Sequence, residues 1–472
     1  MLKQCLCQMT IWLLLFSCSA LASEEPRLYT GAIEVPTLGP LEMTLGISES
    51  EEGTFVLLTV PTQGAEAVPI AATYNQHAEL VAQLSQAGLV FTVKENDDLT
   101  MLHGQMDQAG MTFPIAFVRV DEVPTLVRIQ NPEGPFPYTS TEITALHPEG
   151  HTLAGTLTVP EGEGPFACAV LISGSGMQDR DESLMGHKPF LVIADYLTRN
   201  GIAVLRFDDR GVGGSVVEDM DTLEDVTSED FATDVTVMVG TARWQPNIDP
   251  LRVGVIGHSE GGLIGPLVAV DDDKLAFVVM LAGPGVPGYE LMPVQSAMLL
   301  QAGDVDQELI DGIVNASMNI YEMYQGEVDE IELRSQMMEL VDLQLITQGI
   351  KVTAEEFNEI IDDSLEQFGT PWFQWFLYYD PAPTLAAVEC PVLAMNGTLD
   401  TQVSSTQNLP VIEETITNAG GDVTIIELEG LNHLFQKATT GAVAEYGQIE
   451  TTFEPIALEA LGQWLTEVTD YD

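Results

Sequence analysis

The sequence predicts an α/β fold: a mostly parallel sheet flanked by helices, interrupted by an inserted helical segment and preceded by an antiparallel β domain. Three observations predict it. Short strand-like runs separated by turn residues fill residues 27–120. From residue 139 onward, strand-like runs alternate with segments of helix length, which is typical of a parallel sheet with crossover helices. Between residues 289 and 380 the apolar spacing is helical, and no strong strand appears.

Residues 1–22 are predicted to be an export signal, so we expect a periplasmic or secreted protein. Lys3 supplies the positive charge, Ile11–Phe16 form a short apolar run, and Ala20–Ala22 end in the small residue that precedes cleavage. Two alternatives stay open. The run could be an uncleaved anchor, although it is too short to span a bilayer. Leu15–Cys18 also loosely resembles a lipoprotein signal, which would make Cys18 a lipid anchor.

The charge is strongly one-sided, with 72 Asp and Glu against 16 Lys and Arg and a net charge of −56. Such a surface repels nucleic acid, anionic lipid heads and anionic polymers, so none of these is an expected partner. A saline habitat is a hypothesis that fits this composition. Outside the signal, Cys168 and Cys390 are expected to be free buried thiols, and no cysteine spacing typical of zinc occurs. We therefore predict no cofactor and no metal site.

Residues 23–130 are predicted to form the antiparallel β domain. Its clearest strand-like runs are Thr54–Val60, Leu89–Val93 and Ile115–Val120. No catalytic group of residues is evident there, and His77 and His103 are expected at the surface or in turns. Residues 131–138 are predicted to be a linker, because residues 131–137 contain three prolines and so favour an extended chain.

The α/β domain is assigned to residues 139–288 and 381–472. Its expected strands are Ala169–Ser173, Ala203–Phe207, Val253–Gly257, Phe277–Leu281, Val392–Asn396 and Val423–Leu428. Its expected helices are Lys188–Arg199, Ser228–Arg243, Asn408–Asn418 and a last one that ends near Thr466. Residues 289–380 are interpreted as a helical cap inserted into this domain. A separate domain is the disfavoured alternative, since strand-like runs resume afterwards and complete the same sheet.

Ser259 is the predicted nucleophile. An apolar strand runs directly into Gly257-His258-Ser259-Glu260-Gly261, and a helix-compatible run follows. A serine on such a sharp turn needs small residues on both sides, because strand and helix approach closely there. The five-residue pattern alone occurs by chance in about one chain of this length in seven. The strand before it and the helix after it make the prediction specific.

A serine hydroxyl needs a base, and in α/β enzymes with this turn the acid and then the histidine follow the serine in the chain. His433 is the only histidine after Ser259, and it follows the expected strand Val423–Leu428. Asp400 comes just after the expected strand Val392–Asn396, so both side chains belong at carboxyl ends of parallel strands. Asp422 begins a strand and Asp380 lies where the cap rejoins the domain, so Asp400 is preferred.

Two backbone N–H groups are expected to stabilise an oxyanion. One is that of Glu260, and the other is that of Ser175 in the loop Ser173–Gly176, with Gly176 as the next choice. A plain glycine turn is the alternative for this loop. The predicted substrate pocket contains loop residues and the aromatic residues at the end of the cap. These are Gly174, Gly176, Met177, Trp372, Trp375 and Phe376.

Three other features receive a structural interpretation. The charges of Arg206–Arg210 follow a strand and are expected to form buried pairs, although contact with substrate is an alternative. His187 could line the site but is more readily explained as a residue at a helix start. His258 receives no chemical role.

An ordered set of motifs resembles bacterial exported α/β-hydrolases related to the serine aminopeptidase and dienelactone hydrolase groups. These motifs are Thr152-Leu-Ala-Gly-Thr-Leu-Thr-Val-Pro160, Ile172-Ser-Gly-Ser-Gly-Met-Gln-Asp-Arg-Asp181, Phe207-Asp-Asp-Arg-Gly-Val-Gly213, Gly257-His-Ser-Glu-Gly-Gly262, Asn396-Gly-Thr-Leu-Asp-Thr-Gln-Val403 and Gly430-Leu-Asn-His433. The resemblance runs from Thr139 to the C-terminus. The stretch from Leu102 to Pro114 is similar to the domain that precedes some of these hydrolases. Met177 departs from the pattern, since relatives often have proline there.

The resemblance implies an α/β-hydrolase fold, a carboxylesterase activity and the triad Ser259, Asp400 and His433, which the residue argument reaches separately. We therefore predict a serine hydrolase that cleaves small-molecule carboxylic esters through an acyl-enzyme. A serine peptidase or a thioesterase on the same triad is the alternative, and a non-catalytic binding protein is a third. The sequence predicts no integral membrane span and leaves a homo-oligomer undetermined.

Overall fold

The computed structural model describes residues 26–35, 39–50, 53–63, 65–84, 88–108, 111–124, 126–326 and 329–470. The predicted export signal, Cys18 included, lies outside these residues. The described chain forms two compact units, which are treated separately below. One contains the residues up to Val127 together with Gly303–Leu365 and Tyr446–Gln448. The other contains Arg128–Ala302, Glu366–Glu445 and Ile449 onward.

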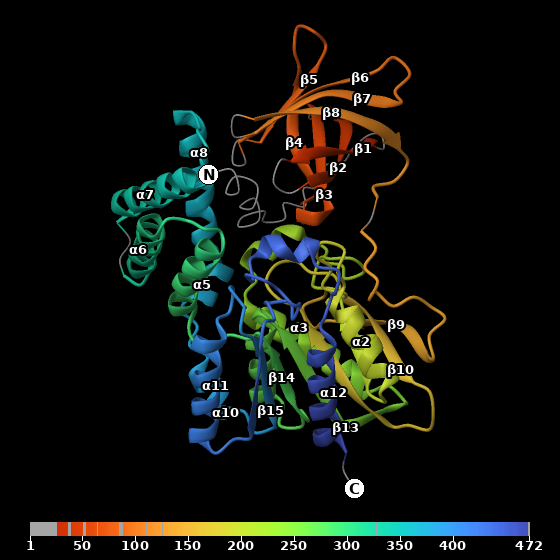
Figure 1. Cartoon of the computed structure of the whole chain (residues 1–472). Coiled ribbons are helices and arrows are strands. Elements are labelled where there is room, and N and C mark those ends of the chain that lie inside the picture. The colour runs from red at the N-terminus through yellow and green to blue at the C-terminus, as the bar shows by residue number, and fades with distance from the viewer. Residues whose placement is uncertain are drawn as a thin grey trace. The chain divides into compact units, whose positions relative to one another are not determined.

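The N-terminal strands form a closed antiparallel barrel, drawn in red to orange in Figure 1. Its strands are β1 (Arg27–Val35), β2 (Gly39–Ser50), β3 (Gly53–Val60), β4 (Ala65–Tyr74), β5 (Leu80–Leu84), β6 (Leu89–Glu95), β7 (Met101–Gln108) and β8 (Met111–Val120). Each strand pairs with the next, and β1 closes the barrel on β8 at Leu28 and Val120. Alternate residues of β8 such as Phe113, Ile115 and Phe117 are buried, as a half-buried strand requires. The antiparallel β domain is confirmed, and its closure into a barrel is an addition.

The same unit contains two complete helices from the inserted segment, α6 (Gln307–Tyr324) and α7 (Glu330–Gln348), and most of α8 (Ala354–Phe368). Each of the first two begins with an aspartate whose carboxylate accepts backbone N–H groups, Asp306 for α6 and Asp329 for α7. The α7 helix ends at Gly349, which takes the left-handed conformation. The helical character predicted for residues 289–380 is therefore observed.

The second unit is built on an eight-stranded sheet in the order β16-β15-β14-β13-β11-β12-β10-β9. Its strands are β9 (Tyr138–Leu146), β10 (Thr152–Pro160), β11 (Phe166–Ile172), β12 (Ala203–Phe207), β13 (Ile248–His258), β14 (Val278–Leu281), β15 (Val392–Gly397) and β16 (Val423–Leu428). Neighbours from β12 to β16 are parallel, whereas β9 and β10 add antiparallel pairs at one edge. This is the α/β-hydrolase arrangement expected from the sequence.

Helices cover both faces of this sheet, so its central strands are apolar on both sides. On β11, Cys168, Val170 and Ile172 belong to one core, which includes residues of α3 (Ser228–Arg243), α4 (Glu260–Asp271) and α11 (Ser405–Ala419). Ala169 and Leu171 belong to the other core, with residues of α2 (Pro189–Arg199) and α12 (Pro455–Thr469). Every residue of β12 is buried for the same reason. The two cores hold the strands in place, and the carboxyl ends of the parallel strands therefore lie along one edge of the sheet.

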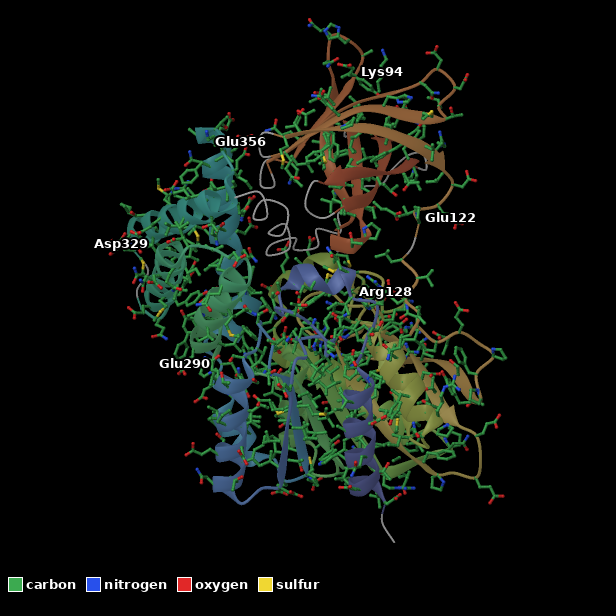
Figure 2. The ribbon with its side chains drawn as sticks, in the orientation of Figure 1. Lys94, Glu122, Arg128, Glu290, Asp329 and Glu356 are labelled. Carbon is green, nitrogen blue, oxygen red and sulfur yellow. The ribbon has the colours of Figure 1, made fainter. Side chains whose placement is uncertain are left out.

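Shorter elements complete the description. The second unit also contains α5 (Gly288–Ala302), α9 (Pro371–Tyr378), α10 (Ala382–Ala387) and the 3₁₀ turn η3 (Met220–Asp225). Two further 3₁₀ turns are η1 (Pro61–Gln63) and η4 (Val443–Gln448). Among the described residues, no helix combines the length and the apolar character needed to cross a membrane. Figure 2 shows how the negative charge is carried, with exposed carboxylates such as Glu122, Glu290 and Asp329 ending on the outside of the ribbon.

Candidate active site

Ser259 lies on a strained turn between the end of β13 and the start of α4. Its φ is 54° and its ψ is −121°, a conformation that residues with a Cβ rarely adopt. Close packing on both sides enforces this turn. A Cβ on Gly257 would lie 1.9 Å from the Gly261 carbonyl oxygen, and one on Gly261 would lie 2.3 Å from that of Ile172. The glycines of the motif are therefore required by backbone contacts.

The loop after β11 lies directly against Ser259. A Cβ on Gly174 would be 3.1 Å from the Ser259 Cβ, so any larger residue at 174 would press on the serine. The Ser259 backbone N–H donates to the Leu281 carbonyl oxygen at 2.9 Å, which ties the turn to the end of β14. The carboxyl ends of β11, β13 and β14 thus converge on this serine.

Asp400 lies in the turn after β15 and is fully buried. Its Oδ1 accepts the backbone N–H groups of Gln402 at 2.8 Å and Val403 at 2.9 Å. Its Oδ2 lies 2.8 Å from His433 Nδ1. The first two contacts fix the carboxylate, and the third orients the histidine ring.

His433 lies in the loop after β16, and its position depends on contacts between two loops. The Leu399 N–H donates to the Leu431 carbonyl oxygen at 2.9 Å, and the Thr398 N–H donates to the Leu428 carbonyl oxygen at 3.0 Å. A Cβ on Gly397 would be 2.1 Å from the Leu431 oxygen, so this close approach also requires glycine. The structure therefore brings Asp400 and His433 together, 33 residues apart in the chain, as predicted from the strand ends.

His258 contacts both His433 and the loop after β11. Its Nε2 lies 3.0 Å from the His433 carbonyl oxygen, and the two rings are 4.8 Å apart at their centroids. Its Nδ1 lies 2.9 Å from Glu182 Oε1, which also accepts the Gly174 N–H at 2.9 Å. Burial by itself would lower the pKa of His258, but the charge and hydrogen bond of Glu182 raise it above the ordinary value. A carboxylate oxygen and a carbonyl oxygen are both acceptors, so the two contacts fit a ring that donates from both nitrogens.

The two backbone amides predicted as oxyanion donors lie at the start of α4 and in the loop after β11. Glu260 is the first residue of α4, where helix N–H groups have no partner within the helix. Ser175 lies in the exposed part of the loop after β11. Within the described part of the chain, neither amide donates a hydrogen bond to another group. The Gly174 amide, by contrast, is taken by Glu182.

The Glu260 side chain links three elements behind the turn. It is buried, and its Oε1 accepts the Ser228 hydroxyl of α3 at 2.5 Å and the Trp372 indole N–H of α9 at 2.8 Å. The Ser175 side chain is a further hydrogen-bond partner. Burial raises the pKa of the Glu260 carboxyl. Trp372 is the predicted pocket residue that contacts the turn in this way.

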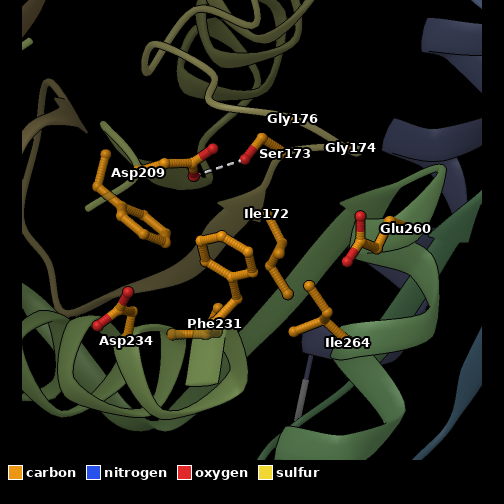
Figure 3. Close-up of a pocket in the computed structure, with 11 residues that line it drawn as sticks. Ile172, Ser173, Gly174, Gly176, Asp209, Phe231, Asp234, Glu260 and Ile264 are labelled. Carbon is orange, nitrogen blue, oxygen red and sulfur yellow. Dashed lines mark hydrogen bonds between the residues drawn. The ribbon is translucent and has the colours of Figure 1, made fainter. Parts of the chain in front are cut away.

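A narrow cavity of about 10 Å³, the volume needed for one water molecule, lies beside the loop after β11. Of the predicted pocket residues, Gly174 and Gly176 line it, together with Ser173, Asp209 and Glu260 (Figure 3). Asp209 accepts the Ser173 hydroxyl and the Gln178 N–H, each at 2.8 Å. Burial raises the pKa of Asp209 to about 8. The two hydrogen bonds that Asp209 accepts fix the base of the loop after β11.

The remaining predicted pocket residues, Met177, Trp372, Trp375 and Phe376, are not among the residues that line this cavity. Trp372 stacks on Phe376 at 5.6 Å, and Trp375 stacks on Tyr379 at 4.3 Å. Met177 lies beside Gly211.

The residues given a structural interpretation pair with buried or half-buried partners. Asp208 pairs with Arg180 at 2.7 Å, Arg210 pairs with Asp234 at 2.7 Å, and Arg206 pairs with Asp181. His187 is fully buried, with Nδ1 2.8 Å from the Thr452 hydroxyl. Cys168 and Cys390 are free thiols, the first buried and the second half-buried.

Sequence reasoning missed the contacts of Glu182, His258 and the Glu260 side chain. Glu182 and His258 are 76 residues apart, and Glu260 and Trp372 are 112 apart. No spacing rule connects such pairs. A buried carboxyl beside a glycine-rich loop could have been suspected from the three acidic residues Asp179, Asp181 and Glu182, but its partner could not.

Comparisons with known proteins find a family model that matches the part of the chain containing Ser259. Residues 188–312 match the family model described as serine aminopeptidase, S33. Esterase EstD of Thermotoga maritima is 36% identical over 151 residues, which is 32% of this chain and 35% of that protein. The match thus spans about a third of that relative. The family match ends before Asp400 and His433.

Solved structures are more distant. An esterase of Pyrococcus furiosus is 12% identical with a TM-score of 0.43, and the alignment covers 74% of this chain and all (100%) of that one. The 2,6-dihydroxy-pseudo-oxynicotine hydrolase is 14% identical with a TM-score of 0.39, over 70% of this chain and 68% of that one. Residues 188–312, which include the strained turn of Ser259, are thus similar to the serine aminopeptidase family model.

Proposed function

We propose that the protein is a serine hydrolase that cleaves carboxylic esters, with Ser259 as nucleophile, His433 as base and Asp400 as the acid that orients the base. The observation that carries the proposal is the buried contact of 2.8 Å between His433 Nδ1 and Asp400 Oδ2, at the same sheet edge as the strained Ser259. Similarity to esterase EstD over 151 residues supports ester hydrolysis.

The proposed reaction follows from the hydrogen bonds. Since His433 Nδ1–H donates to Asp400, its Nε2 is left to accept the proton of the Ser259 hydroxyl. The serine oxygen attacks the ester carbonyl, and the resulting oxyanion accepts from the N–H groups of Glu260 and Ser175. His433 then gives the proton to the leaving alcohol, which leaves an acyl-enzyme. Water, deprotonated by His433, releases the acid and restores the serine.

The test is Ser259→Ala assayed with short p-nitrophenyl esters. We expect kcat/KM to fall at least about 10³-fold, because the nucleophile is lost while the fold is kept. Ser335→Ala, an exposed serine in α7, is the matched control and should keep full activity. A fluorophosphonate should label the wild type and not the Ser259 variant. Undiminished ester hydrolysis by Ser259→Ala would refute the proposal, and absent labelling of the wild type would favour a binding protein.

A peptidase is the second candidate, because the matching family model is that of a serine aminopeptidase. The same triad serves esters, thioesters and amides, so the turn cannot distinguish them. A panel of matched acyl esters, thioesters and aminoacyl amides separates the activities by kcat/KM. We expect esters to be the best substrates, and a preference for aminoacyl amides would support the peptidase.

A further inference from the structure

A turn of four residues, Arg128–Asn131, opens the second unit and binds backbone groups of two distant segments. The Asn131 N–H donates to the Arg128 carbonyl oxygen at 3.0 Å, which closes the turn. Arg128, labelled in Figure 2, is buried, and its guanidinium donates to the Met185 carbonyl oxygen at 2.8 Å and to the Ile449 carbonyl oxygen at 3.1 Å. The turn is therefore fixed to the loop before α2 and to the segment before α12.

The side chain of Gln130 fixes the backbone just before α12. Its Oε1 accepts the N–H groups of Thr452 and Phe453, both at 2.8 Å, and its Nε2 donates to the Phe453 carbonyl oxygen at 2.7 Å. Both ends of one side-chain amide are thus used on two successive residues, which leaves that backbone few other arrangements. Gln130 is itself half-buried. The position of Phe453 therefore depends directly on this glutamine.

Phe453 packs against Phe435, which lies shortly after His433 in the chain. The two rings are buried and stack with centroids 5.0 Å apart. The Glu454 N–H also donates to the Phe435 carbonyl oxygen at 2.9 Å. Phe435 has a φ of 58°, which costs free energy in a residue with a Cβ and persists only where surrounding contacts hold it. The contacts with Phe453 and Glu454 are of this kind.

His433 lies inside the turn that Phe435 closes. The Phe435 N–H donates to the Asn432 carbonyl oxygen at 2.9 Å. The Asn432 Oδ1 in turn accepts the N–H groups of Leu434 at 3.1 Å and Gln436 at 2.8 Å. The backbone is therefore fixed on both sides of His433, and the direction of the histidine ring depends on that backbone.

We propose that Gln130 is a positioning residue for His433, acting through the stack of Phe453 on Phe435. This role rests on the proposed function, in which His433 is the catalytic base. A misplacement of about 1 Å can lower a rate about 10²-fold, so a small shift of this turn is enough to slow the chemical step. Substrate binding is expected to change little, since Gln130 does not line the cavity beside the loop after β11. The segment that leads from the barrel into the α/β domain thus serves catalysis as well as connection.

The first test is Gln130→Met in the full-length protein, because methionine is close to glutamine in length and lacks its hydrogen-bonding amide. We expect kcat for short p-nitrophenyl esters to fall about 10-fold, with KM within about 2-fold of the wild type. Labelling by a fluorophosphonate should slow by a similar factor, since it requires the same activated serine. Gln463→Met, the same change at an exposed position of α12, is the matched control and should leave kcat and KM unchanged.

Two further variants separate positioning from stability. Phe453→Leu keeps an apolar side chain and loses the aromatic stack, so kcat should fall about 3-fold. In the double variant with Gln130→Met, kcat should fall little further than in Gln130→Met alone, because both changes act on the same turn. Arg252→Ala removes a hydrogen bond of 2.6 Å to the Pro165 carbonyl oxygen, just before β11 and far along the chain from His433. It should lower the urea midpoint and keep the wild-type kcat.

Failure of this role can be told apart from failure of the proposed function. A wild-type kcat in both Gln130→Met and Phe453→Leu would overturn the positioning role, as would a change confined to KM. If Gln130→Met does not fold, the kcat of Phe453→Leu alone decides. A kcat that falls as far in Arg252→Ala as in Gln130→Met would show that lost stability is the cause and would also overturn the role. Activity retained by Ser259→Ala would instead refute the proposed catalytic site, whatever the Gln130 variant does.

Discussion

Glu182 is the residue through which the loop after β11 and the backbone of His433 are held together. Its Oε1 accepts the Gly174 N–H and the His258 Nδ1–H, each at 2.9 Å. The other nitrogen of His258 donates to the His433 carbonyl oxygen at 3.0 Å. One buried carboxylate therefore positions, through His258, two parts of the proposed catalytic machinery. It is a positioning residue, since it contacts neither Ser259 nor the reacting atoms.

Glu182→Gln is expected to lower kcat for short esters about 10-fold with little change in KM, since the loop and the His433 backbone lose a charged anchor. Glu163→Gln, an exposed glutamate in the turn before β11, should leave both constants unchanged. Steady-state kinetics with short esters give kcat and KM for both variants and test this expectation. A wild-type kcat in Glu182→Gln would mean that the carboxylate has no positioning role.

The same variant has a pH-dependent effect on stability. The pKa of His258 in the folded protein is raised above its ordinary 6.5 by Glu182. The stability that the charged pair contributes is therefore fully present below about pH 6.5 and is lost as pH rises through the folded pKa. Urea unfolding should show the largest difference between wild type and Glu182→Gln near pH 6 and a smaller one near pH 9. A difference that grows with pH would contradict this assignment.

At the scale of elements, the start of α4 is constrained by the strand beside it. Gly261 lies where a Cβ would be 2.3 Å from the Ile172 carbonyl oxygen and 2.6 Å from that of Ser173. Gly240, inside α3, has nothing within 4 Å of the position a Cβ would take. Gly240 therefore has room for a larger side chain, whereas Gly261 has none. The difference arises from the close approach of α4 to β11, which the Ser259 turn imposes.

We expect Gly240→Ala to stabilise the protein by about 0.5–1 kcal/mol, because alanine favours the helix and the space is open. Gly261→Ala should destabilise it by roughly 2 kcal/mol or more, because the β11 backbone must shift. The free energy of unfolding in urea measures both, and each variant is the control for the other. Equal effects of the two substitutions would show that α4 and β11 are not packed as described.

At the scale of the whole molecule, the net charge of −56 opposes compactness in both units. Some of the ion pairs in the described residues are buried, such as Arg210 with Asp234. Acidic residues outnumber basic ones 72 to 16, so exposed carboxylates such as Glu122 and Asp329 add to a surface that repels itself (Figure 2). The screening length falls from about 30 Å at 0.01 M salt to about 3 Å at 1 M.

The thermal unfolding midpoint should therefore rise by at least about 3 °C between 0.01 M and 1 M NaCl. KCl should give a similar rise, because screening depends on ionic strength. Differential scanning calorimetry measures both transitions if the two units unfold separately. A midpoint that falls or stays constant with salt would mean that surface repulsion does not limit stability.

Most elements of the fold could be predicted, because their signals are local. The predicted bounds of β12, β16 and α3 coincide with those observed, since continuous apolar runs and helical spacing are properties of short windows. The closure of the barrel could not be predicted, because it depends on pairing between β1 and β8. The helical segment predicted as a single cap is divided between the two compact units, which sequence periodicity cannot reveal.

The sequence by itself determined which residue types follow each strand: Ser259 in its glycine turn, Asp400 and the lone downstream His433. This was possible because parallel strands carry their loops to one edge, so order along the chain predicts proximity. Only the tertiary structure decided the pairs that join distant segments: Glu182 with His258, Glu260 with Trp372, and Gln130 with Phe453. Those contacts depend on how helices and loops pack over the sheet, and packing joins residues whose separation in the chain carries no periodic signal.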